Sequence, residues 1–207
     1  MKQYIISEDQ LNAIANAIRF KTGLSNKMSP SEMATAIREI TPENNEKLDA
    51  LIGRASNDID SNTATQISAY AFYYYRTLKS VNFPAVVSVG NDAFFGCTEL
   101  ANVNLDSVRS VGARAFAGCS SLRSINFRSS GLSSLQAYCF NGSSLEEIWL
   151  PASVFCAVVS TTFYGCPLSP DGTGGKIYLP ARFRTAYEAN QNWSSVIGSA
   201  NNTIISY

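Results

Sequence analysis

Histidine is absent from this sequence of 207 residues, and only 15% of the residues are charged. Its absence excludes histidine metal ligands, Ser–His and Cys–His nucleophile pairs and any imidazole pH switch. The 16 basic and 16 acidic residues balance, which argues against a protein that binds nucleic acid or an anionic membrane surface. No run of eighteen apolar residues occurs, so we expect no insertion into a membrane.

The first residues also lack the apolar core of a secretory signal, so we expect a protein that stays in the cytoplasm or leaves without the usual export route. Charge is unevenly distributed along the chain. Residues 1–60 hold 7 of the basic and 9 of the acidic residues, whereas the remainder is rich in Ser, Asn, Gly, Ala and apolar residues. This shift predicts two domains, residues 1–60 and residues 61–207.

The N-terminal domain has the pattern of short amphipathic helices. Ser7 and Gln10 have the spacing of a capping box, and Ser29 followed by Pro30 is a second helix start. The apolar stripes that follow are the candidate assembly residues Leu11, Ile14, Ile18, Met33, Ile37 and Ile40. Because stripes this short bury little surface, two alternatives are open: a helical cap on the next domain, or an attachment and oligomerisation module.

Residues 11–19, 21–23 and 28–37, which carry these two helix patterns, resemble a segment common near the N-terminus of tail and baseplate proteins of phages that infect Gram-positive bacteria. The resemblance implies a virion component that is assembled in the host cytoplasm. It also implies other virion tail proteins as partners.

The remainder of the chain is a repeat. Five phenylalanines recur at intervals of 22, 22, 24 and 23 residues, namely Phe72, Phe94, Phe116, Phe140 and Phe163. After each of the first four, a leucine leads into an apolar–polar–apolar stretch, which is typical of a short strand with one face inward. One such unit buries too little to stand alone, so stacked copies must share a core. We therefore predict an α+β protein: a small helical N-terminal module followed by a solenoid of about five coils.

Residues 89–105 and 111–127 are near copies of one another, with an Ala-Phe pair, a cysteine and a leucine at matching positions. Over residues 65–180, this pattern resembles the BspA-like leucine-rich repeat family. Pro84, Pro151 and Pro180 follow the strand as in that family, whereas Asp106 and Arg128 depart from the proline. A closing helix is expected after Pro180, with residues 180–207 as a C-terminal cap and Phe183, Tyr187 and Trp193 on its buried side.

Catalysis and metal binding have little support in the sequence. Cys97, Cys119 and Cys166 share one repeat position, and Cys139 occupies the small position before Phe140. Buried thiols that fill space are the expected state, although a disulfide between Cys97 and Cys119 is not excluded by distance; Cys156 has no place in the pattern. We predict no catalytic residues, no metal, no cofactor and no enzyme activity.

A binding face has better support. The residue between the last two apolar positions of each strand should point outward and form a column, whose members are the candidate ligand-binding residues Asn82, Asn104, Asn126, Trp149 and Tyr178. Amides beside aromatic rings suit sugars, which offer hydroxyls and apolar C–H faces. The alternative is a solvated strand surface on which Trp149 packs against a neighbouring element.

Together, these patterns predict a tail fibre or baseplate protein, located in the phage virion, that adheres to a bacterial surface glycan or protein through its repeat face. Several copies on one particle would bind by avidity, and a homo-oligomer, with a trimer as the guess, is expected. Two rivals are open: a purely structural tail component and a bacterial surface adhesin.

Overall fold

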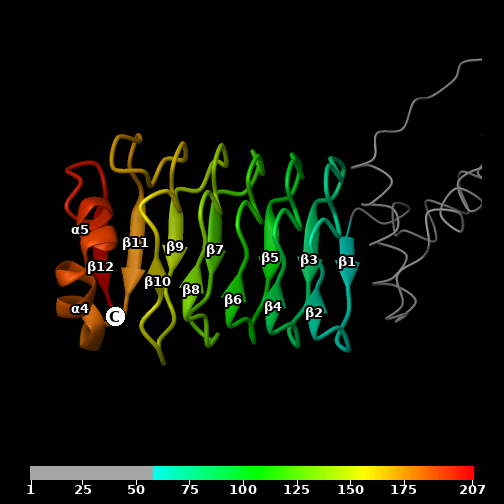
Figure 1. Cartoon of the computed structure of the whole chain (residues 1–207), viewed down its shortest axis with the longest axis horizontal. Helices are drawn as coiled ribbons and strands as arrows, with labels where there is room; N and C mark the ends of the chain where they lie inside the picture. Colours follow the sequence, from blue (N-terminus) through cyan, green and yellow to red (C-terminus); the bar gives the residue numbers. More distant parts are fainter. Residues whose placement is uncertain (1–57) are drawn as a thin grey trace, which may run out of the picture.

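Short parallel strands, stacked along one axis, make up most of the computed structural model, which describes residues 58–207 (Figure 1). The predicted helical module and its assembly residues Leu11, Ile14, Ile18, Met33, Ile37 and Ile40 lie outside the described residues. Within residues 58–207, no helix is long and apolar enough to cross a membrane.

One row of strands carries the predicted alternating pattern. Its members are β1 (Asp58–Asp60), β3 (Ser80–Asn82), β5 (Asn102–Asn104), β7 (Ser124–Asn126), β9 (Glu147–Trp149), β11 (Lys176–Leu179) and β12 (Thr203–Ser206). Hydrogen bonds join them in two parallel sheets, β1-β3-β5 and β7-β9-β11-β12. The strand pairing is therefore interrupted between β5 and β7, although the two strands remain neighbours in the stack, and the regular sequence spacing does not predict this break.

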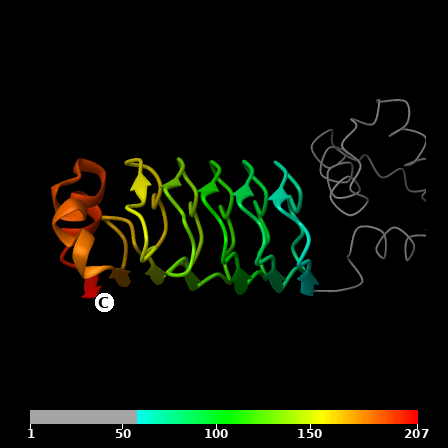
Figure 2. The ribbon, with the colours of Figure 1, turned by 90° about the horizontal axis from the view of Figure 1, so that it is seen from below.

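A second row of two-residue strands lies across the coil from the first (Figure 2). It consists of β2 (Gln66–Ile67), β4 (Ser88–Val89), β6 (Ser110–Val111), β8 (Ser134–Leu135) and β10 (Ala157–Val158). All five pair in parallel, in one sheet of order β10-β8-β6-β4-β2. Each coil thus contributes two strands, whereas the sequence pattern predicts one.

The repeated phenylalanines form a ladder in the core. Phe72, Phe94, Phe116, Phe140 and Phe163 are all at most 4% exposed. Consecutive rings lie nearly parallel, with centroids 5.1 to 5.8 Å apart. This spacing matches the separation of neighbouring strands to within about 1 Å, so each coil adds one ring to a continuous apolar stack and the predicted solenoid core is confirmed.

The C-terminal end is closed by more than the single helix expected from the sequence. A short 3-10 helix (η2, Ala181–Phe183) leads into α4 (Arg184–Ala189) and α5 (Gln191–Ile197), and β12 then returns to the sheet. Tyr187 and Trp193 are fully buried, as predicted, whereas Phe183 is only partly buried. This cap covers the last phenylalanine, since Trp193 packs on Phe163 with ring centroids 5.5 Å apart.

Cys156, which has no place in the repeat, joins the last coil to this cap. Its backbone N–H donates to the hydroxyl of Tyr187 at 3.0 Å, and its carbonyl accepts from the indole Nε1 of Trp193 at 2.7 Å. Both helices are therefore fixed to one buried residue. One sign of this contact is present in the sequence: Cys156 lies outside the repeat pattern, as expected for a residue that binds the cap and not the next coil.

Candidate functional site

The five predicted ligand-binding residues lie on the outward side of the first row of strands, but they form two groups. Asn82 pairs with Asn104 across β3 and β5, while Asn126, Trp149 and Tyr178 are register partners across β7, β9 and β11. Asn126 is exposed and the other four are half-buried. β5 and β7 are neighbours in the stack, but no strand pairing joins them, so Asn104 and Asn126 are not register partners.

The three asparagine side chains differ in which hydrogen-bonding groups remain available to a ligand. Asn104 donates from Nδ2 to Oδ1 of Asn82 at 2.7 Å, which ties these two side chains together. Asn126 instead accepts at Oδ1 from the backbone N–H of Arg128, at 2.9 Å. Its Nδ2 group has no protein partner within residues 58–207. Asn126 is therefore fixed in orientation with a donor still available.

Trp149 and Tyr178 stack on each other, with ring centroids 4.3 Å apart and planes 4° from parallel. The two side chains come from neighbouring strands, so the rings stand side by side and each covers one face of the other. The second face of Trp149 is on the side of β7, where its register partner is the much shorter Asn126.

A row that the sequence did not mark as a site borders this stack. Tyr207 donates its hydroxyl to the carbonyl of Leu150, and the guanidinium of Arg128 lies 4.3 Å from the centroid of the Tyr207 ring. Arg182 donates to the carbonyl of Ala152 in the same region. Burial raises the pKa of Tyr207, while the charges of Arg128 and Arg182 oppose that shift. One sequence signal existed: Arg128 stands where three of the other coils have proline, at Pro84, Pro151 and Pro180.

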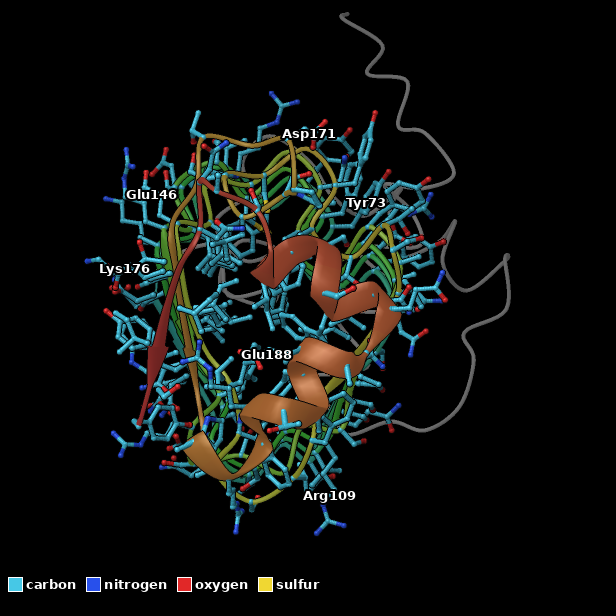
Figure 3. The ribbon with its side chains drawn as sticks, turned by 90° about the vertical axis from the view of Figure 1, so that its left-hand side faces the viewer. Tyr73, Arg109, Glu146, Asp171, Lys176 and Glu188 are labelled. Atoms are coloured by element: carbon cyan, nitrogen blue, oxygen red, sulfur yellow. The ribbon has the colours of Figure 1, made fainter. Side chains whose placement is uncertain are left out.

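Ion pairs border the other side of the stack. Lys176 pairs with Glu147 at 2.8 Å, and Arg123 pairs with Glu146 at 2.6 Å. The bond to Glu147 and its charge raise the pKa of Lys176. Glu146 and Lys176 lie on one side of the solenoid, whereas Tyr73 lies on the opposite side (Figure 3). The ligand-binding candidates thus have their own face of the molecule.

A second aromatic cluster occupies that opposite side, at the first described coils. Tyr73 stacks on Phe95 with centroids 5.2 Å apart, and Tyr74 meets Phe95 edge to face at 5.3 Å. Tyr74 is 42% exposed. These rings belong to adjacent coils, and the next coils carry Ala117 and Asn141 at the position of Phe95, so the cluster is local.

The cysteines form no reactive or metal-binding group. All five are free and buried, so Cys97 and Cys119 form no disulfide. Burial raises the pKa of Cys119 and Cys156 to about 12 and that of Cys166 to about 11, which keeps them as thiols at neutral pH. Among residues 58–207, no group of three or more Cys, Asp or Glu side chains is placed to hold a metal ion.

Stacked coils of parallel strands around a ladder of leucines and phenylalanines define a leucine-rich repeat protein. More particularly, residues 58–170 match the family model described as a BspA type leucine rich repeat region of six copies, and the chain belongs to that family. The match starts at residue 58 and so does not include the segment 11–37.

Two solved structures are similar to this chain. A leucine-rich repeat protein from Bacteroides ovatus is 21% identical, with a TM-score of 0.45 over 72% of this chain and 42% of that protein. A leucine-rich cell surface protein from Faecalibacterium prausnitzii is 17% identical, with a TM-score of 0.35 over 60% of this chain and 48% of that protein. The similar region thus spans less than half of either protein. No curated protein matches the chain.

Proposed function

We propose that this chain is a non-enzymatic adhesion protein that binds a glycan of a bacterial surface through the outward face of β7, β9 and β11. The observation that carries the proposal is the stacked pair Trp149–Tyr178 with the short, oriented Asn126 beside it. A sugar ring presents an apolar C–H face and a rim of hydroxyls, so it is recognised by an aromatic face next to an amide.

Such a sugar ring would fit above the short side chain of Asn126, against the face of the Trp149 indole that Tyr178 does not cover. Tyr178 covers one face of the indole, and the short Asn126 side chain stands on the side of the other face. A sugar seated above Asn126 would place its C–H face on the indole and a hydroxyl oxygen at Nδ2 of Asn126. Tyr178 would then act as support, holding the indole upright.

The virion context remains part of the proposal and rests on the resemblance of residues 11–37. In that setting the solenoid would be carried on a phage tail fibre or baseplate in several copies, and weak single sites would bind firmly by avidity. The expected partners are then other virion tail proteins and further copies of the chain.

A structural tail component is the second candidate, and the aromatic cluster of Tyr73, Tyr74 and Phe95 favours it. Tyrosine and phenylalanine are enriched where proteins contact one another. In this case the cluster, not the face with Trp149, would contact a neighbouring subunit.

The test measures how the labelled full chain binds to bacterial cells and to their wall polysaccharides. The wild type is compared with its Trp149→Ala variant. The matched control is Tyr164→Ala, since Tyr164 is an exposed aromatic residue, at 57%, that follows Phe163 as Tyr73 follows Phe72. We expect the wild type and the control to bind and Trp149→Ala to lose about tenfold or more in affinity. Binding that survives Trp149→Ala, in a variant with an unchanged unfolding curve, would refute this site.

A further inference from the structure

We propose that the glycan is acidic, and that Arg128, assisted by Arg182, binds a carboxylate or phosphate group on the sugar that lies against Trp149. This inference rests on the proposed function, because it assigns a charge to the ligand of the same face. It is carried by Arg128, which stands where the family pattern has proline, and by Tyr207 and Arg182 of the C-terminal cap, which lie outside the repeat.

The row lies just past the ends of the strands, two residues after the outward positions: Arg128 follows Asn126, Pro151 follows Trp149, Pro180 follows Tyr178 and Tyr207 follows Ile205. Both prolines are buried. The bond from the Tyr207 hydroxyl to the Leu150 carbonyl carries that ring from β12 back toward β9. Tyr207 therefore links the guanidinium of Arg128 to the backbone of the residue that directly follows Trp149.

Arg128 is held in place without being neutralised. Its guanidinium carbon lies 4.3 Å from the centroid of the Tyr207 ring, a cation–π contact that restrains the group and still allows its N–H groups to bind an anion. The ion pairs of residues 58–207 involve Arg114, Arg123, Lys176 and Arg184, not Arg128. An exposed guanidinium with no carboxylate partner is ready for an anion from outside.

Arg182 adds a second positive charge at the same place. It donates to the Ala152 carbonyl and lies 4.7 Å from the centroid of the Phe183 ring, and it too has no ion pair with a described carboxylate. The charges of both arginines act on Tyr207 and oppose the rise of its pKa. One carboxylate, the exposed Asp106, stands in the row on the preceding coil, and it forms no ion pair with Arg128.

The positions of Trp149 and Arg128 suit one substituted sugar. Arg128 comes two residues after Asn126, the register partner of Trp149 on the neighbouring strand, so the Cα atoms of Arg128 and Trp149 are no more than roughly 12 Å apart. A sugar whose ring rests on the indole can therefore reach the guanidinium with a ring substituent. A guanidinium forms parallel bonds to two oxygens of one carboxylate or phosphate, and a neutral hydroxyl offers no such pair.

The test uses a panel of immobilised oligosaccharides in three matched arms: hexuronic acid oligomers, their methyl esters and oligomers bearing sugar phosphates. The full chain is compared with Arg128→Gln and with Arg109→Gln, a matched loss of charge at another corner of the solenoid (Figure 3). We expect at least one acidic arm to be bound, the esters to bind about tenfold more weakly, and Arg128→Gln to lose about tenfold on the acidic arm only. Arg109→Gln should bind as the wild type does.

Each alternative result has a separate meaning. If the esters bind as well as the acids, and Arg128→Gln changes neither, the acidic ligand is refuted while the glycan site stands. If the wild type binds no arm and no bacterial wall polysaccharide, the proposed function and this inference both fail. Asp106→Asn gives a second check, since removal of the nearby negative charge should strengthen binding of the acidic arm; unchanged or weaker binding counts against the subsite.

Discussion

The ring of Tyr74 lies directly against Gly96 of the following coil. A Cβ atom on Gly96 would come within 2.7 Å of Cδ1 of Tyr74, so the ring occupies space that only glycine leaves open. Both residues hold the same position in their coils, two residues after the buried phenylalanine, and both have positive φ, 54° and 70°. The first described coil therefore uses a tyrosine in a left-handed turn, and the glycine of the next coil makes room for it.

Gly96→Ala should destabilise the protein more than Gly118→Ala. Both glycines have φ near 70°, so each alanine carries the cost of a left-handed side chain, about 1 kcal/mol. At Gly118 the nearest atom to the new Cβ is 3.5 Å away, whereas at Gly96 the methyl group meets Tyr74. We expect a further loss of about 1 kcal/mol at Gly96, measured by urea unfolding. The extra loss should vanish in a Tyr74→Gly background; its persistence there would contradict the contact.

The cap should depend on the two hydrogen bonds at Cys156. Trp193→Phe leaves the buried Cys156 carbonyl without its donor, and Tyr187→Phe leaves the N–H of Cys156 without its acceptor. A buried backbone group left unpaired costs about 1–3 kcal/mol. We expect each variant to lower the free energy of unfolding by that amount, with Tyr164→Phe as the exposed control. Variants as stable as the control would mean that packing alone holds the cap.

Asp92 and Arg114 form the ion pair on which stability should depend most. The Asp92 side chain is only 3% exposed, and Arg114 reaches both of its oxygens at 2.9 Å from Nε and Nη2. Arg114→Met leaves a buried carboxylate without its cation and should cost about 1–2 kcal/mol. Arg123→Met, which breaks an exposed pair with Glu146, should cost at most about 0.5 kcal/mol. Equal losses in thermal or urea unfolding would show that the burial of Asp92 is unimportant.

The five cysteines should be unreactive toward a thiol reagent until the protein unfolds. The sequence contains five cysteines, and all five are buried and free. We expect native protein at neutral pH to release no colour with a disulfide reagent, and denatured protein to titrate as five thiols. Fast labelling of even one thiol in the native state would contradict this arrangement.

The same burial predicts a loss of stability at alkaline pH. The pKa of Cys119 and Cys156 rises from 9.0 to about 12, and that of Cys166 to about 11. Because the folded state holds these protons more tightly than the unfolded state, their contribution is complete below about pH 9 and is lost as the pH rises toward about 12. Burial also raises the pKa of Tyr187, with the same sign. The free energy of unfolding should therefore fall as the pH rises from about 9 toward about 12, and less steeply in Cys119→Ala.

The sequence predicts the solenoid well because the determinant is local and repeated. Phe94 and Phe116 recur in matching surroundings, as do Val89 and Val111. The residues that face the core in one coil therefore predict those that face it in the next coil. The second row of strands is harder to predict, since strands of two residues, such as β4, are too short to show alternation. The apolar residue of each of these strands, such as Val89 in β4, is nevertheless part of the repeat.

The cap and the site are less predictable because their contacts join residues far apart in the chain. β12 has no match in the repeat, and nothing local in Thr203–Ser206 says that it will pair with β11. Asn126, Trp149 and Tyr178 are placed outward by alternation alone. The stacking of the two rings on each other and the position of Arg128 on Tyr207 depend on strand register and on the return of the chain end, which no single segment specifies.

The regular stacking of coils along the phenylalanine ladder also sets the length of the solenoid. Residue 58 and Tyr207 lie at opposite ends of the stack (Figure 1), and four strand steps from β1 to β9 amount to roughly 20 Å. An anchor ahead of Asp58 would therefore present Trp149 near the far tip of a rod. Removing one whole coil, such as residues 88–109, would rejoin matching surroundings and shorten the reach by about 5 Å. Coil number can thus set how far the tip extends while the chemistry at the tip stays the same.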